Sequence, residues 1–212
     1  MKRIAPAVLA ACLVVPFASS ARGADKGAGA KPAAKVLAVV DSLGLLEGAV
    51  ARDSTKFENL SRLGVMYLDS DRATDAARVL LKADQVRPNQ LAVLVNLGAA
   101  FDAMGRPEDA QGYYHRALKI APDDVIATCR LATSLYSRSH YPEAVSLLRD
   151  IIAKNPNAHC AYFTLGVAFA DAGIFRDAIR MWKKVVELAP GSPEAVSARE
   201  SITVLEKYIQ RP

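Results

Sequence analysis

Apolar positions along the chain recur with the spacing of two amphipathic helices, and the whole pattern returns every 34 residues. The clearest copy is Leu91–Asp124, which predicts two helices joined by a Gly-Arg-Pro turn, with a proline near its end. Unit positions 4, 7, 8 and 11 fall on one face of the first helix, and positions 20, 24 and 27 on one face of the second. A period of this length predicts an all-α stack of helical hairpins.

Four units share one register, namely 57–90, 91–124, 125–158 and 159–192. Position 7 is leucine and position 20 is alanine in every unit, while position 8 is glycine except at Ala132. Small residues at positions 8 and 20 allow the two helix backbones to approach closely, and bulky residues at position 24 fill the adjoining space. An acidic residue at position 19 lies in the first turn of each second helix, where it complements the helix dipole. Proline at position 32 ends each second helix.

These features together resemble the tetratricopeptide repeat, a helix–turn–helix unit of 34 residues. The resemblance covers Phe57–Ser192 without an insertion. It departs from the family pattern at Ala132 and at position 4, where tryptophan is replaced by Leu60, Leu94, Thr128 and Tyr162. The resemblance implies a right-handed α-solenoid whose concave groove, lined by the first helices, binds a protein or peptide partner.

Residues 1–24 have the pattern of a secretory signal peptide: a basic start, an apolar run from Ile4 to Phe17, and small residues after it. The apolar run is shorter than a typical transmembrane helix, although a signal peptide that stays uncleaved as a membrane anchor is an alternative. Leu-Ala-Ala before Cys12 also resembles a bacterial lipobox, but the apolar run continues beyond this cysteine. We therefore expect an exported protein, periplasmic or in the cell envelope if bacterial, with a lipoprotein acylated at Cys12 as the alternative.

Removal of this leader changes the charge of the protein. The whole chain has 27 basic and 22 acidic residues and a formal net charge of +5. The leader carries Lys2, Arg3 and Arg22 and no acid, so the remainder has 24 basic against 22 acidic residues, a net charge of +2. A nearly balanced charge does not favour nucleic acid as a partner.

The segments that flank the repeats have their own patterns. Residues 25–34 are rich in glycine, alanine and lysine and predict a flexible linker. Residues 35–56 predict an N-terminal helical segment that covers the first unit as a degenerate half-repeat, with Ser42, Leu46 and Ala49 at positions 20, 24 and 27. A free amphipathic helix that binds a partner or dimerises is the alternative. Residues 193–212 predict a C-terminal capping helix, with apolar residues Val196, Ile202, Leu205 and Ile209.

No pattern of catalytic or metal-binding residues occurs in the sequence, so we expect no enzyme activity, no cofactor and no metal. The three histidines share no spacing, and there is no His-Glu-x-x-His, phosphate-binding glycine loop or Cys-x-x-Cys. Cys129 and Cys160 fall on the inner sides of neighbouring first helices. In an oxidising compartment they form a disulfide between units or remain two separately packed thiols.

The resemblance implies that unit positions 2, 5, 6, 9, 12 and 13 of the first helices face the groove. Asn96 and Arg130 match two residues of the two-carboxylate clamp of some family members. The full clamp is excluded because Ser61, Val65 and Ile126 stand at its other positions. Arg62 and Arg130 remain candidates for binding a single carboxylate. The predicted groove residues are Arg62, Val95, Asn96, Ala99, Ile126, Arg130, Tyr136, Phe163 and Val167.

The first helix of the fourth unit is apolar almost all round, so we expect a cover over Phe163 and Val167. A partner segment, a second copy or the chain's own N-terminal part would provide it. The sequence therefore predicts an exported adaptor or scaffold for protein–protein interaction in the assembly of an envelope complex. A self-associating structural solenoid and a membrane-tethered assembly factor are the alternatives, and the step from fold to biology rests on analogy.

Overall fold

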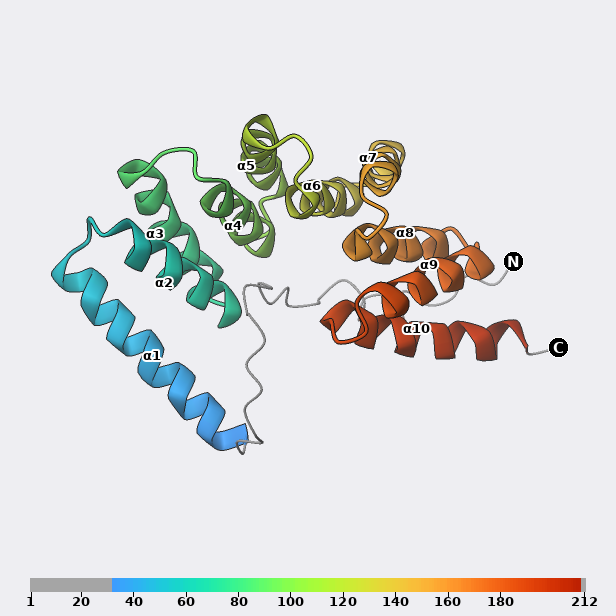
Figure 1. Cartoon of the computed structure of the whole chain (residues 1–212), viewed down its shortest axis with the longest axis horizontal. Coiled ribbons are helices and arrows are strands. Elements are labelled where there is room, and N and C mark those ends of the chain that lie inside the picture. Colours follow the sequence, from blue (N-terminus) through green and yellow to red (C-terminus); the bar gives the residue numbers. More distant parts are fainter. Residues whose placement is uncertain (1–31, 211–212) are drawn as a thin grey trace. The chain divides into compact units, whose positions relative to one another are not determined.

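The computed structural model describes residues 32–210, which form ten helices and no strand (Figure 1). The predicted signal peptide, with Cys12, and residues 25–31 lie outside the described residues. Helix α1 begins at Pro32, so the last three residues of the range predicted as a linker, 32–34, are helical. The helices are α1 (Pro32–Arg52), α2 (Phe57–Asp69), α3 (Ala73–Val86), α4 (Leu91–Ala103), α5 (Pro107–Ile120), α6 (Val125–Ser137), α7 (Tyr141–Lys154), α8 (His159–Asp171), α9 (Phe175–Leu188) and α10 (Pro193–Ile209).

The helix boundaries follow the sequence period. The helices α2, α4, α6 and α8 each have 13 residues and begin at the first residue of a predicted unit. Their hairpin partners α3, α5, α7 and α9 each have 14 residues. The predicted all-α solenoid of helical hairpins is therefore confirmed.

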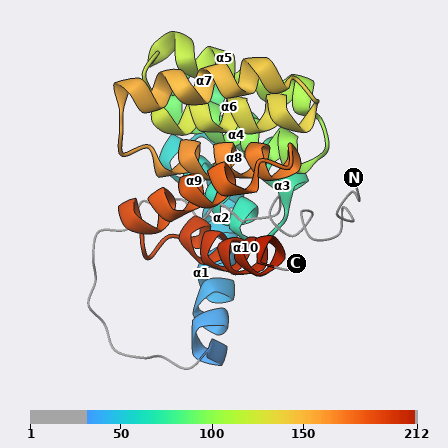
Figure 2. The same ribbon diagram turned by 90° about the vertical axis from the view of Figure 1, so that its right-hand side faces the viewer.

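The chain divides into two compact units between Ile120 and Ala121. We refer to the described residues 32–120 as the N-terminal unit and to 121–210 as the C-terminal unit. In the N-terminal unit, α2 packs on α3 and α4, α4 packs on α5, and α1 packs on α2. In the C-terminal unit, α6 packs on α7 and α8, and both views show α8, α9 and α10 side by side (Figures 1 and 2).

Glycine at position 8 lies against the bulky residue at position 24 of the same hairpin. A Cβ atom added to Gly98 would lie 2.6 Å from Cζ of Tyr114, and one added to Gly166 would lie 2.8 Å from Cε2 of Trp182. The alanines at position 20 are completely buried in all four units. The predicted close approach of the two helices in each hairpin is therefore confirmed, and the buried ring of Tyr114 or Trp182 occupies the space that a Cβ would need.

Each hairpin turn places one residue, at unit position 15, in the left-handed region. These residues are Asp71 (φ 56°), Gly105 (φ 71°), Ser139 (φ 65°) and Gly173 (φ 77°). In the first unit, the Arg72 N–H donates to the Tyr67 carbonyl at 2.8 Å and the Asp71 N–H to the Leu68 carbonyl at 3.2 Å. This pair of bonds defines a Schellman helix end, and the same pair recurs in the other three units.

In the first two units, the arginine after that turn packs back onto the preceding helix. The Arg72 guanidinium lies 4.3 Å from the ring centre of Tyr67, and that of Arg106 lies 4.8 Å from Phe101. Both arginines also pair with the acid at position 19, with Arg72 Nη2 2.7 Å from Asp75 Oδ2. Hydrogen bonds from Arg72 and Arg78 lower the pKa of the Asp75 carboxyl. The first-turn acid therefore has an ion-pair partner in addition to the helix dipole.

The terminal helices α1 and α10 differ in part from the pattern predicted for them. Glu47 on α1 accepts hydrogen bonds from Tyr67 Oη at 2.8 Å and from Arg72 Nη1 at 3.1 Å, which hold α1 on the first hairpin. Ser42 is exposed, in contrast to the buried alanines at the equivalent position of the four repeats, so the half-repeat stays a prediction. On α10, Ile202 and Leu205 are buried, whereas the side chains of Val196 and Ile209 are exposed.

Candidate partner-binding surfaces

The N-terminal unit places four of the predicted groove residues on two helices that pack against each other, α2 and α4. Arg62 on α2 is exposed. On α4, Asn96 and Ala99 are half-buried, and Val95 is buried. We call the groove-facing positions of α2 and α4 the N-terminal inner face. It offers a guanidinium and an amide to solvent, both of which can bind a carboxylate or a peptide backbone.

The C-terminal unit places the other five residues on α6 and α8, whose groove-facing positions we call the C-terminal inner face. Ile126 is exposed and Arg130 is half-buried. Tyr136, Phe163 and Val167 are buried, with 8%, 8% and 4% of their surfaces exposed. Phe163 and Val167 therefore have cover within the chain itself, and in this state they offer little area to a partner. Their role as apolar anchors stays a prediction.

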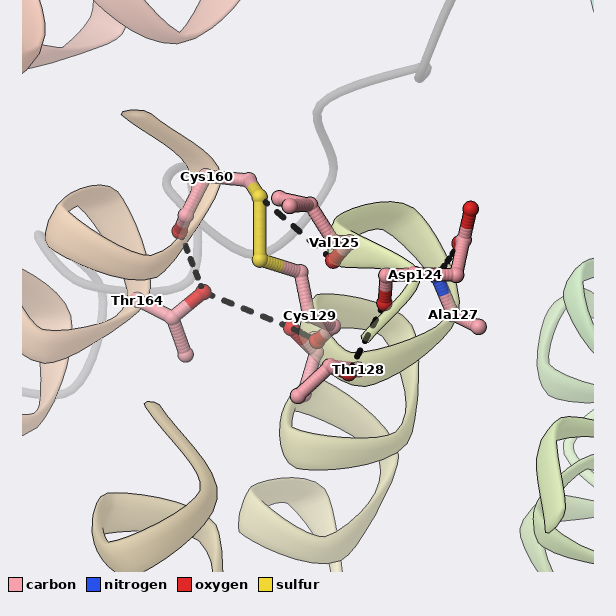
Figure 3. The surroundings of a disulfide bond; sticks show 8 residues. Asp124, Val125, Ala127, Thr128, Cys129, Cys160 and Thr164 are labelled. Atoms are coloured by element: carbon pink, nitrogen blue, oxygen red, sulfur yellow. Dashed lines mark hydrogen bonds between the residues drawn. A yellow bond between two sulfur atoms is a disulfide. The ribbon is translucent and has the colours of Figure 1, made fainter. Parts of the chain in front are cut away.

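A disulfide joins the two helices of the C-terminal inner face (Figure 3). It links Cys129, in the second turn of α6, to Cys160, in the first turn of α8, with a Cα–Cα distance of 6.1 Å. Both cysteines are buried, at 4% and 7% exposure. The structure thus selects the disulfide from the two states that the sequence left open. The Cys160 sulfur also lies 4.0 Å from the Val125 carbonyl oxygen, a contact rather than a hydrogen bond because an oxidised sulfur carries no proton.

Two further contacts join α6 to α8 along the same face. The hydroxyl oxygens of Thr133 and Thr164 lie 3.4 Å apart. Each hydroxyl is also within bonding distance of the carbonyl of the cysteine one turn earlier, at 2.9 Å for Thr133 and 3.1 Å for Thr164. A hydroxyl has a single proton, so at most one of the two can donate to the other. The Thr–Thr contact is consequently weak.

The second of these two contacts, between Tyr136 and Asp171, is stronger than the contact between the threonines. Tyr136 Oη donates to Asp171 Oδ2 at 2.5 Å. Burial, together with this hydrogen bond to a carboxylate, raises the pKa of the Tyr136 phenol well above its usual range. The groove-facing unit positions 9, 6 and 13 include Thr133, Thr164 and Asp171. The sequence did not show which residues they contact, because that depends on the register between two helices.

The described residues contain no group of three or more His, Cys, Asp or Glu side chains arranged to hold a metal ion. Among those same residues, no helix has the length and apolarity needed to cross a membrane.

Comparison with known proteins agrees with the repeat geometry. A family model described as Tetratricopeptide repeat matches residues 95–159 and again residues 129–193. The type IV pilus assembly protein PilF of Pseudomonas aeruginosa is 26% identical over 149 residues, which cover 69% of this chain and 59% of PilF. The chain spans smaller fractions, down to 6%, of other curated relatives, including proteins from Homo sapiens and Caulobacter vibrioides.

Solved structures show the same fold at low sequence identity. The crystal structure of MamA matches with a TM-score of 0.60 and 20% identity, over 81% of this chain and 99% of MamA. YrrB, described as a TPR protein with an unusual peptide-binding site, matches with a TM-score of 0.56 and 20% identity, over 79% of this chain and 86% of YrrB. The repeat fold is one that supports protein–protein interaction scaffolds. From its repeat sequence, its helical hairpins and these matches, the chain belongs to the tetratricopeptide repeat family.

Proposed function

We propose that this protein is an exported scaffold that binds a segment of a partner protein on the inner faces of its first helices. The observation that carries the proposal is the N-terminal inner face, where Arg62 is exposed on α2 and Asn96 and Ala99 are half-buried on α4, which packs against it. A guanidinium and an amide next to small side chains suit an extended segment that carries a carboxylate, because the small residues let the segment approach the helix. The peptide-binding site in the description of YrrB is consistent with this use of the fold.

Export is supported by two independent features. The first 24 residues have the sequence pattern of a signal peptide. The Cys129–Cys160 disulfide is a modification typical of oxidising compartments and rare in the reducing cytosol. A role in assembling an envelope complex is supported by the similarity to PilF, whose name describes pilus assembly.

The test is a pull-down from the native envelope fraction with Arg62→Glu as the variant. Lys82→Glu is the matched control, because Lys82 is also exposed, lies on the outer helix α3 of the same hairpin, and undergoes the same change of charge. We expect Arg62→Glu to lose a partner that the wild type and Lys82→Glu both retain. Equal recovery of the same partners by all three proteins would remove the N-terminal inner face from the function.

Phe163 and Val167 are unsuitable for this experiment. A glutamate at either buried position would leave a charge without water, so loss of a partner could reflect unfolding rather than a lost contact.

A self-associating structural role is the second candidate, favoured by the surface of α10. Val196, Val204 and Tyr208 fall on one side of this helix, and 51%, 47% and 43% of their surfaces are exposed. Light scattering over a range of concentrations separates the two candidates, since a partner scaffold stays at the monomer mass and a self-associating solenoid does not. Tethering through Cys12 would instead add the mass of a lipid to the mature protein.

A further inference from the structure

We propose that the Cys129–Cys160 disulfide is an oxidation-dependent lock on the C-terminal unit, which completes the inner face of α6 and α8 only after the chain reaches an oxidising compartment. The claim that the chain reaches an oxidising compartment depends on the proposed export. The effect of the disulfide on the C-terminal unit depends only on the geometry of that unit. Reduction would loosen the C-terminal unit and leave the N-terminal unit unchanged.

The position of the bond makes it a crosslink between successive repeats. It joins cysteines 31 residues apart, and the loop that it closes contains the whole of α7 and the turns on both sides of it. A crosslink that closes a loop of this size removes many conformations from the unfolded chain. It therefore shifts the unfolding equilibrium of the crosslinked region toward the folded state by roughly 10²- to 10³-fold.

The Thr133–Thr164 and Tyr136–Asp171 contacts between α6 and α8 cannot replace this restraint. The Thr133–Thr164 contact is long, at 3.4 Å, and the two hydroxyls have competing carbonyl acceptors. The Tyr136–Asp171 hydrogen bond lies near the opposite ends of the two helices, in their last turns. In the reduced protein, the N-terminal ends of α6 and α8 would therefore lose the covalent bond that joins them.

The N-terminal unit has no equivalent crosslink. The positions that correspond to Cys129 and Cys160 in the preceding pair of repeats are Ser61 on α2 and Ala92 on α4. Neither residue can form a disulfide, so oxidation acts directly on one unit of this chain. The same two positions also provide a matched site for introducing a second crosslink.

The oxidation requires an acceptor, which we assign to the class of thiol–disulfide oxidoreductases in their disulfide form. The two cysteine thiols lose two protons and two electrons as the S–S bond forms, and the acceptor disulfide takes up both to become a dithiol. Because both cysteines are buried in the folded unit, the exchange must take place before α6 and α8 have packed or during local opening. Once packed, the bond is shielded from soluble thiols.

The test is urea unfolding of the full chain in its oxidised and reduced forms. Trp182 is the single tryptophan and lies buried in α9, so its fluorescence follows the C-terminal unit, while circular dichroism follows the helices of both units. We expect reduction to increase the unfolding equilibrium constant measured by Trp182 by roughly 10²- to 10³-fold. Hydrogen exchange should accelerate in α6 and α8, and should change less than about twofold in α2 and α4.

Two variants sharpen this result. Cys129→Ser with Cys160→Ser should reproduce the reduced protein in either redox condition. Ser61→Cys with Ala92→Cys should make the N-terminal unit respond to oxidation as the C-terminal unit does. If the serine variant does not fold, reduced wild type still decides the question.

Equal exchange rates in α6 and α8 for the oxidised and reduced proteins would overturn the lock, as would a uniform acceleration across both units. The compartment is tested separately, by the intact mass of the protein isolated from its own cells with free thiols blocked. Two blocked thiols at Cys129 and Cys160 would contradict export to an oxidising compartment without affecting the stability measurements.

Discussion

The contact between Gly98 and Tyr114 allows the cost of a single added methyl group to be worked out. In Gly98→Ala, the new Cβ would lie 2.6 Å from Tyr114 Cζ and 2.7 Å from Cδ1, far inside van der Waals contact. The ring cannot easily withdraw, because Tyr114 is completely buried and its hydroxyl donates to Asp102 at 2.9 Å. Overpacking of this kind costs about 1–3 kcal/mol. Alanine also has a higher helix propensity than glycine, which offsets about 1 kcal/mol of that cost.

Gly112→Ala is the matched control for this substitution. Gly112 lies inside the partner helix α5 and is exposed, and a Cβ added there would have no atom within 4 Å other than its immediate neighbours and its own helix backbone. This variant should therefore gain about 1 kcal/mol from helix propensity alone. The difference between the two variants isolates the overpacking cost, which we expect to be about 1–3 kcal/mol in the free energy of unfolding.

The assay is urea unfolding followed by circular dichroism, since Trp182 reports on the other unit. Gly98→Leu should be less stable than Gly98→Ala, because the larger side chain must displace the ring further. If Gly98→Ala proved as stable as Gly112→Ala, the tight approach of α4 and α5 at this position would be wrong.

Further predictions concern the hairpin turns and Tyr136. Ser139→Gly should raise the free energy of unfolding by about 0.5–1 kcal/mol, because glycine adopts φ > 0 without a steric cost, and Asp71→Gly should gain less because aspartate tolerates this region better. Loss of stability in either variant, measured by urea unfolding, would contradict this account of the turn. The folded state raises the pKa of Tyr136 above its unfolded value of about 10, so its contribution to stability is present below pH 10 and is lost as the pH rises above that value. Wild type should therefore lose more stability than Tyr136→Phe between about pH 9 and pH 11, and parallel losses would refute the assignment.

Much of the fold follows from the sequence, because the residues that determine each hairpin are local and recur. Leucine at position 7, alanine at position 20 and a tiny residue at position 8 mark the faces of two helices that are joined by a short turn. Their periods predict where the helices begin, and α2, α4, α6 and α8 start at the first residue of each predicted unit. The contact of Gly98 with Tyr114 follows from the same reasoning, since a glycine opposite a bulky residue requires close packing.

The hairpin turns show where such a pattern is incomplete. Position 15 is glycine in two units, but Asp71 and Ser139 adopt the same left-handed conformation in the others. The Schellman hydrogen bonds impose this conformation whatever the side chain, so residue identity alone does not reveal it.

Tertiary structure decided the features that depend on how far one repeat lies from the next. Helical periodicity assigned Cys129, Cys160, Phe163 and Val167 to inner faces, but it contains no distance between two helices. The packing of α6 on α8 brings the two cysteines within bonding distance. The folded chain also covers Phe163 and Val167, although they stand at groove-facing positions, while Arg62 at such a position remains exposed. A repeat pattern specifies which side of a helix a residue lies on, whereas its partner and its exposure depend on segments distant in the chain, which only the folded structure brings together.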